Sequence, residues 1–138
     1  MEKRMNKKEL IQLLESLPID KEEFWILSSS ALVIRNLLKD AGDLDMAVTI
    51  EGLEQLKSHF DLKQKENGWY IVNDKIECVL DNKEDWKVEK YGDYYLQSLE
   101  MYFDYLKNSS REKDKIKYEI VKEYLESRQE HGNSELKK

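Results

Sequence analysis

The stretch WILSSSALVIRNLLKDAGDLDMAVT, residues 25–49, decides how this chain is expected to fold. It opens with a short apolar run, passes through three serines into an apolar helical segment, and ends in a run that alternates polar and apolar residues. Serine hydroxyls often cap helix starts, and an alternation of period two is typical of a strand with one buried face. The stretch therefore predicts strand, helix and strand, with Asp43 and Asp45 on the polar side of the second strand.

A helix is expected on each side of this stretch. Residues 6–18 have Asn6 as a plausible N-cap, Glu9 three residues later and leucines on one helical face, and Pro18 then stops the helix. Residues 51–60 also have helical spacing. The deciding stretch is thus flanked by amphipathic segments. Within it, Arg35 is expected at the surface, with its stem over apolar neighbours.

Strands and then helices are expected in the rest of the chain. Residues 61–81 read as strands that turn near Asn67-Gly68 and near Asn73-Asp74. The last third carries two apolar helical stripes, the first beginning at Leu96, separated by Asn108, Ser109 and Ser110. We expect an α+β fold in which a small mixed β-sheet is packed by helices and followed by a C-terminal helical pair.

Length and composition favour one globular domain. The chain has 138 residues, of which 40% are hydrophobic and 38% charged, enough for one core and a heavily charged surface. No repeat or Pro- or Gly-rich linker divides it. We expect a single domain over residues 1–128 and a disordered tail over residues 129–138, where apolar periodicity is lost.

Charge and cysteine content restrict the environment and the partners. No apolar run approaches the ~20 residues of a membrane span, and the N-terminus has no signal-peptide core, so we expect no membrane partner and no export. The single cysteine, Cys78, suggests a reducing compartment, and a cytoplasmic protein is expected. A net charge of -6 disfavours indiscriminate nucleic-acid binding.

Three acids form a candidate metal site. Asp43 and Asp45 are two residues apart on one strand, so their carboxylates would lie within ~7 Å of each other. Repulsion between them favours a compensating hard cation. In KIECVL, residues 75–80, Glu77 is the acid that faces away from the apolar side, which makes it the candidate third ligand. The alternative is that all three are ordinary acids on the solvent side of the strands.

The order of these elements resembles the signature of the nucleotidyltransferase superfamily, which includes polymerase-beta-like enzymes. That signature is a short apolar strand, a small or hydroxylic turn, a helix, D-x-D on the next strand, and an acid on a later strand. Ser28 and Ser29, Asp43 and Asp45, and Glu77 occupy those places. The family normally has Gly-Gly or Gly-Ser where this chain has the two serines.

A second segment supports the resemblance. SSREKDKIKYEIVKEYL, residues 109–125, is similar to the R-x-K-D segment and following helix of small abortive-infection-type nucleotidyltransferase-like proteins; here the motif is Arg111, Lys113 and Asp114. The two segments stand in the right order. The likeness extends over roughly residues 24–127.

The resemblance implies a metal-dependent transfer of a nucleoside monophosphate from a nucleoside triphosphate. Mg²⁺ or Mn²⁺ would assist an acceptor hydroxyl in attacking the α-phosphorus, and pyrophosphate would leave. The catalytic and metal-binding residues would be Asp43, Asp45 and Glu77. The residues that receive the triphosphate would be Ser28, Ser29, Ser30, Arg111 and Lys113.

Two questions stay open at the level of sequence. The acceptor could be a small molecule, an RNA end or a protein, and a partner protein or self-association could complete the site. The alternative function is a catalytically inactive module of the same fold that binds a nucleotide or a protein, for example as an antitoxin-like partner. Ser28 and Ser29 favour this alternative, whereas the three acids oppose it.

Overall fold

A computed structural model describes residues 4–136 of the chain, and side chains up to residue 128. The chain divides into two compact units, Met1–Ser98 and Leu99–Lys138. Over the described residues the first unit contains a seven-stranded and a two-stranded sheet with three α-helices, and the second contains two α-helices. The expected α+β class, with a mixed sheet and a C-terminal pair of helices, is confirmed.

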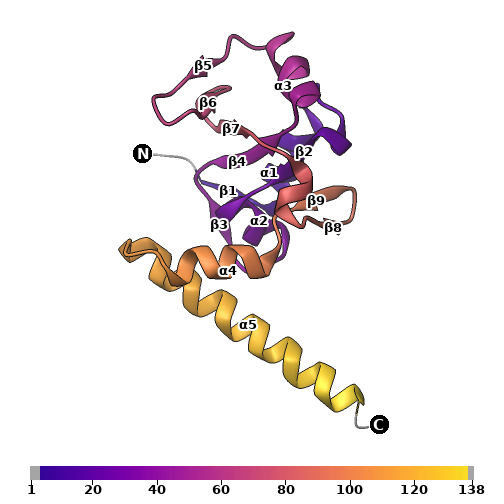
Figure 1. Cartoon of the computed structure of the whole chain (residues 1–138), viewed down its shortest axis with the longest axis vertical. Helices are drawn as coiled ribbons and strands as arrows, with labels where there is room; N and C mark the ends of the chain where they lie inside the picture. Colours follow the sequence, from indigo (N-terminus) through magenta and orange to yellow (C-terminus); the bar gives the residue numbers. More distant parts are fainter. Residues whose placement is uncertain (1–3, 137–138) are drawn as a thin grey trace. The chain divides into compact units, whose positions relative to one another are not determined.

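The first unit alternates short strands and helices (Figure 1). Its strands are β1 (Met5–Asn6), β2 (Phe24–Ile26), β3 (Asp40–Ala41), β4 (Leu44–Val48), β5 (Lys63–Gln64), β6 (Tyr70–Ile71), β7 (Ile76–Leu80), β8 (Glu89–Tyr91) and β9 (Tyr94–Leu96). Its helices are α1 (Lys7–Glu15), α2 (Ser28–Ile34) and α3 (Ile50–Lys57), with short 3-10 turns η1 (Lys21–Glu23) and η2 (Lys83–Trp86).

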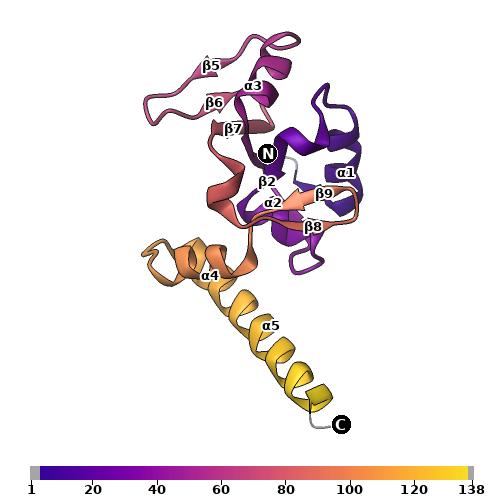
Figure 2. The ribbon, with the colours of Figure 1, turned by 45° about the vertical axis from the view of Figure 1, so that its right-hand side comes forward.

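The larger sheet has the strand order β5-β6-β7-β4-β2-β9-β8. Its centre is mixed: β4 pairs antiparallel with β2 and parallel with β7, and β2 pairs parallel with β9. β1 and β3 form the small antiparallel sheet. Figures 1 and 2 both show α3 beside the β5–β6 hairpin at one end of the larger sheet.

One face of the larger sheet carries the main core. Side chains of α1, α2 and α3 pack there against alternate residues of the central strands, for example Phe24, Met46 and Cys78, which are almost fully buried. The opposite face has a smaller cluster of Trp25, Leu27 and Ala47, packed by residues from strands, turns and η2. Since the side chains of a strand alternate between faces, Asp45 and Glu77 belong to this second face.

The capping signals of the first helix are confirmed. The Asn6 side chain accepts a hydrogen bond from the Glu9 backbone N–H, and the Glu9 carboxylate accepts one from the Asn6 N–H. This reciprocal arrangement is a capping box, and it satisfies N–H groups that a helix start leaves without partners. The turn predicted at Asn67-Gly68 is also present, with Gly68 at φ 93°.

Three details differ from the sequence expectations. β4 begins at Leu44, so Asp43 lies in the bend before the strand and is exposed. Leu96 is expected in a C-terminal helix but lies in β9, because the chain first forms the β8–β9 hairpin. The Arg35 side chain is expected at the surface but is only 7% exposed.

The second unit is a helical hairpin of α4 (Leu99–Lys107) and α5 (Glu112–Leu136). The rings of Phe103 and Tyr118 stack across the hairpin with centroids 5.2 Å apart. The turn between the helices is held by Asp114, whose buried carboxylate accepts a 2.7 Å hydrogen bond from the Ser109 hydroxyl. The two predicted helices are therefore present.

The domain boundaries expected from the sequence stay predictions. The expected single domain over residues 1–128 includes the first unit and most of the second. α5 continues to Leu136 and so overlaps the expected tail of residues 129–138, whose side chains lie outside the described part, as do residues 137–138 altogether. Over the described residues no helix has both the length and the apolar character needed to cross a membrane.

Candidate functional site

Asp45 and Glu77 lie directly opposite each other on the neighbouring parallel strands β4 and β7. Adjacent strands are about 4.8 Å apart, so the two side chains leave the same face of the sheet as close neighbours. Both residues are half-buried. The two acids come from positions 32 residues apart in the chain, and only the strand pairing brings them together.

The third predicted acid, Asp43, lies just before β4, outside the strand pairing that aligns Asp45 with Glu77. It is exposed and precedes β4, so the strand does not fix the direction of its carboxylate. Within the described residues no group of three or more His, Cys, Asp or Glu side chains is arranged to hold a metal ion. The structure therefore presents a two-carboxylate site with an exposed aspartate beside it.

A lysine supplies positive charge at the acid pair. Lys65 Nζ lies 2.9 Å from Glu77 Oε1, and both side chains are about one-third exposed. Lys65 belongs to the turn between β5 and β6, where its backbone N–H donates to the carbonyl of Trp69. We did not expect Lys65 in the site, because it contacts Glu77 across an intervening strand and no local spacing indicates this.

The serine turn, residues 28–30, begins with a backbone conformation that glycine adopts more readily than serine. Ser28 adopts φ 55°, in the left-handed region that L-residues seldom occupy. Its backbone N–H donates to Oε1 of Gln97 at 3.1 Å. Gln97 follows β9 and is nearly buried, and its carbonyl accepts a 3.0 Å hydrogen bond from Arg35.

Ser30 joins the serine turn to the acid-bearing strand. Its hydroxyl donates to the Leu27 carbonyl at 2.8 Å and accepts a longer 3.4 Å hydrogen bond from the backbone N–H of Asp45. The Leu27 N–H in turn donates to the Asp45 carbonyl at 2.9 Å. Ser30 is 1% exposed, so its hydroxyl is occupied inside the fold, whereas Ser28 and Ser29 are half-buried and closer to the surface.

An aromatic cluster adjoins the acids on the same face. Trp25 is fully buried, meets Trp86 edge to face at 6.0 Å, and packs with Ala47 and the half-buried Trp69. The Trp25 indole N–H is buried without an acceptor among the described residues. The tryptophan side chains therefore lie on the same face of the sheet as Asp45, next to Ala47 of the same strand.

The buried Cys78 thiol, next to Glu77 in β7, has low reactivity. Cys78 lies between Glu77 and Val79 on β7 and points to the main core. Burial, with a smaller effect of the neighbouring Glu77 carboxylate, raises the pKa of Cys78 to about 11. The reactive thiolate is therefore scarce at neutral pH, and Cys78 acts as a core residue.

The predicted cationic residues belong to the second unit. Arg111 is about half exposed, and its Nε lies 3.8 Å from the buried carboxylate of Asp114. Lys117 approaches the other oxygen of Asp114 at the same distance. Lys113 is exposed. Asp114, Arg111 and Lys117 together organise the start of α5, which is a structural role that the sequence left open for Asp114.

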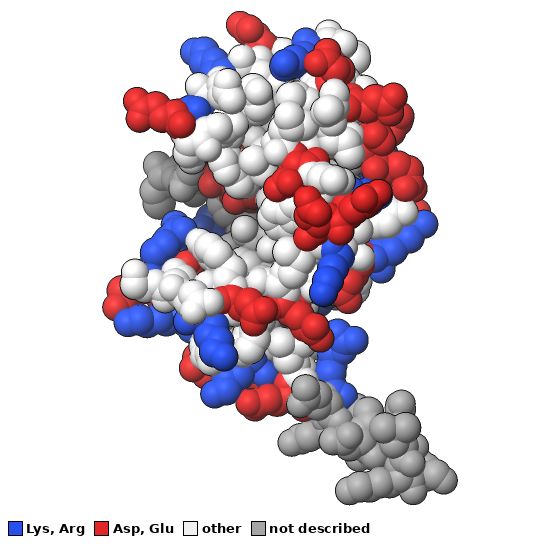
Figure 3. Space-filling view, in the orientation of Figure 1, with Lys and Arg blue, Asp and Glu red and all other residues white. Residues whose placement is uncertain are grey.

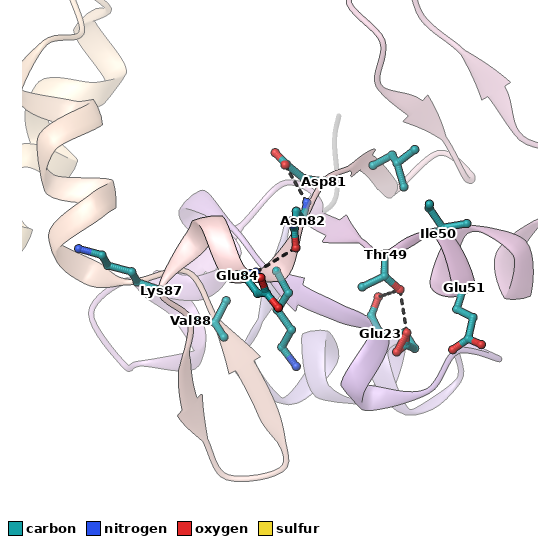
Figure 4. Close-up of a pocket in the computed structure, with 11 residues that line it drawn as sticks. Glu23, Thr49, Ile50, Glu51, Asp81, Asn82, Glu84, Lys87 and Val88 are labelled. Atoms are coloured by element: carbon teal, nitrogen blue, oxygen red, sulfur yellow. Dashed lines mark hydrogen bonds between the residues drawn. The ribbon is translucent and has the colours of Figure 1, made fainter.

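An open depression of about 870 Å³ lies elsewhere on the first unit. It is formed at the carboxyl ends of β4 and β7, whereas Asp45 and Glu77 lie near the amino ends of these strands. Figure 4 shows that several of its polar groups bond to one another: Thr49 donates to Glu23, and Asp81 accepts from the Asn82 backbone. The acid pair and this depression are separate features.

The chain was compared with models of known protein families, with curated proteins and with solved structures, and it matches none of them.

Proposed function

We propose that this protein is a magnesium-dependent nucleotidyltransferase, which binds a nucleoside triphosphate and transfers a nucleoside monophosphate to a hydroxyl acceptor. The observation that carries the proposal is the register of β4 and β7, which sets Asp45 opposite Glu77 on the face away from α1, α2 and α3. The order of strand, serine turn, helix, antiparallel acidic strand and parallel acidic strand supports it.

The donor set at this position suits magnesium. Mg²⁺ is usually held by one or two carboxylates, with water and substrate phosphate oxygens as its other ligands. Asp45 and Glu77 provide two carboxylates, and the exposed Asp43 is near enough in sequence to join them. Lys65 Nζ beside Glu77 already places a cation at this position. When bound, the metal would neutralise charge on the triphosphate.

In the proposed transfer, one bond to the α-phosphorus forms and one breaks. The acceptor oxygen forms a bond to the α-phosphorus, the bond from the α-phosphorus to its bridging oxygen breaks, and pyrophosphate leaves with that electron pair. The proton of the acceptor hydroxyl passes to solvent. Asp45 and Glu77 would hold the metal that binds the triphosphate, and Ser28 and Ser29 lie at the start of α2. The acceptor is a small molecule, an RNA end or a protein.

A specific observation favours a second function. The backbone N–H of Ser28 is already bonded to Gln97, and Glu77 is already paired with Lys65. Such an internally satisfied site suits a catalytically inactive module that binds a nucleotide or a partner protein, as an antitoxin-like partner would. The two functions differ in whether ligand binding requires a divalent metal.

Thermal unfolding with ligands separates these functions. A nucleoside triphosphate with Mg²⁺ at about 100 times its Kd should stabilise the fold by about 2.7 kcal/mol. We expect this stabilisation for at least one of the four nucleotides, and we expect Asp45→Asn to abolish its metal-dependent part. Asp81→Asn is the matched control, because Asp81 follows the other end of β7.

Each outcome has a clear meaning. Stabilisation that requires metal and Asp45, followed by transfer of labelled nucleotide to an acceptor in cell extract, supports the enzyme. Metal-independent stabilisation supports the inactive module. If neither Mg²⁺ nor Mn²⁺ with any nucleotide stabilises the wild-type protein, the nucleotidyltransferase proposal is wrong.

A further inference from the structure

The β5–β6 hairpin, residues 63–71, places two unlike side chains over the acid pair. Lys65 and Trp69 stand at the two sides of its turn, joined by a 2.7 Å backbone hydrogen bond from the Lys65 N–H to the Trp69 carbonyl. The Lys65 ammonium reaches Glu77, and the Trp69 ring packs on the cluster of Trp25, Leu27 and Ala47. A cation and an aromatic ring are therefore delivered to one face by one short element.

The contact between Lys65 and Glu77 is weak enough for the ammonium group to exchange the carboxylate for another anion. Its ion pair with Glu77 is partly exposed, and the Lys65 side chain is 38% accessible. Exposed pairs of this kind are weak, and lysine is a flexible point charge that serves equally well for a carboxylate or a phosphate. A divalent cation at Asp45 and Glu77 would repel the ammonium and leave it free to bind a phosphate oxygen.

Trp69 lies within a nucleotide's reach of the same acids. The antiparallel register pairs Ile71 with Glu77, and Trp69 lies two residues earlier, just before β6. Continued in this register, Trp69 would be a diagonal neighbour of Glu77 at about 7–8 Å. The ring is half-buried, with one side in the aromatic cluster. Nucleobases stack on aromatic rings of this kind with little dependence on base identity.

We propose that the β5–β6 hairpin is the nucleotide-recognition element of this site. Lys65 pairs with Glu77 in the free protein and transfers to a phosphate oxygen when metal and nucleotide bind, while Trp69 stacks on the base. This inference rests on the proposed function and adds to it the residues that recognise the two ends of the nucleotide. It also predicts weak preference among the four bases.

Two variants of the hairpin test the inference with binding readouts. Lys65→Met keeps an unbranched side chain, one atom shorter, and removes its charge. It should bind Mn²⁺ alone about threefold more tightly, because the competing cation is gone, and should bind magnesium nucleotide about tenfold more weakly. Binding of Mn²⁺ alone is measured by electron paramagnetic resonance of the free ion, and nucleotide binding by titration calorimetry.

Inorganic triphosphate separates the roles of the two residues. Lys65→Met should weaken the binding of inorganic triphosphate as much as that of nucleotide. Trp69→Leu should weaken nucleotide about tenfold and leave inorganic triphosphate and Mn²⁺ unchanged, and Trp69→Phe should restore most of the loss. Lys63→Met is the matched control, because Lys63 is an exposed lysine of the same hairpin.

The outcomes distinguish this inference from the function on which it rests. Suppose that the wild-type protein binds magnesium nucleotide through Asp45. If Lys65→Met then changes the affinities for Mn²⁺ alone and for magnesium nucleotide in the same direction, or changes neither, the hairpin proposal is overturned and the function stands. If Trp69→Leu weakens inorganic triphosphate as much as nucleotide, the ring is structural and the stacking contact is wrong. If the wild-type protein binds no nucleotide, both proposals fall.

Discussion

Ser28 occupies a backbone position that suits glycine better than serine. The left-handed conformation brings the Cβ of an L-residue against the neighbouring carbonyl, at a cost of roughly 1–2 kcal/mol. The observed φ of 55° places Ser28 in this region. Glycine would adopt this backbone more easily, and the chain tolerates serine there.

Replacing Ser28 by glycine should stabilise the protein. We expect Ser28→Gly to raise the free energy of unfolding by about 1 kcal/mol, because it relieves the left-handed strain. Urea unfolding followed by circular dichroism measures the change. Ser29→Gly is the control: Ser29 lies within α2 without a positive φ, so glycine there should lower stability by about 0.5–1 kcal/mol. Equal losses in both variants would contradict the strain argument.

At the scale of elements, β9 connects the site to the first helix. β9 pairs with β2 immediately before the serine turn, and the Tyr94 hydroxyl of β9 donates a 2.6 Å hydrogen bond to Glu15 at the end of α1. Burial and this hydrogen bond raise the pKa of Tyr94 above its ordinary value near 10. The folded protein therefore favours the neutral phenol.

This shift predicts a loss of stability at alkaline pH. A raised pKa means that the contribution of Tyr94 is complete below about pH 10 and is lost as the pH rises above that value. We expect Tyr94→Phe to cost about 1 kcal/mol near pH 8 and to flatten the decline of the unfolding free energy above about pH 10.

Denaturant unfolding at several pH values measures both effects. Tyr91→Phe in β8 is the control, because Tyr91 is exposed and should leave the alkaline decline in place. A decline of the same slope in Tyr94→Phe and the wild-type protein would show that Tyr94 is not its source.

Over the whole molecule, charge sets the limits on possible partners. The chain has 29 acidic and 23 basic residues. On the face shown in Figure 3, lysines and arginines are interspersed with acids and do not form a continuous basic stripe. The net charge of -6 disfavours binding of a polyanion, whereas a small nucleotide needs positive charge at one point only.

This charge distribution predicts poor binding to duplex DNA. At about 150 mM salt we expect no binding of a labelled duplex at micromolar protein, because few phosphates would be neutralised. Fluorescence anisotropy measures the binding. Tight binding that falls steeply with added salt would reveal a basic surface and would contradict this expectation.

The β8–β9 hairpin is the part of the fold that the sequence predicts least well. The capping box at Asn6, the strand ending at Ile26 and the hairpin turn at Gly68 carry local signals, so their prediction needed only the neighbouring residues. The β8–β9 hairpin was missed because its strands are short and Leu96 also fits a helical stripe. There, pairing with β2 outweighs the local pattern.

The sequence by itself determined the acid on each strand, the face to which it points, and the α+β class, because residue alternation and capping act within a few residues. Only the tertiary structure decided that Asp45 meets Glu77, that Lys65 pairs with Glu77, and that Gln97 holds the serine turn. Those contacts join strands far apart in the chain. Their register is set by packing across the whole sheet, which no short window of sequence contains.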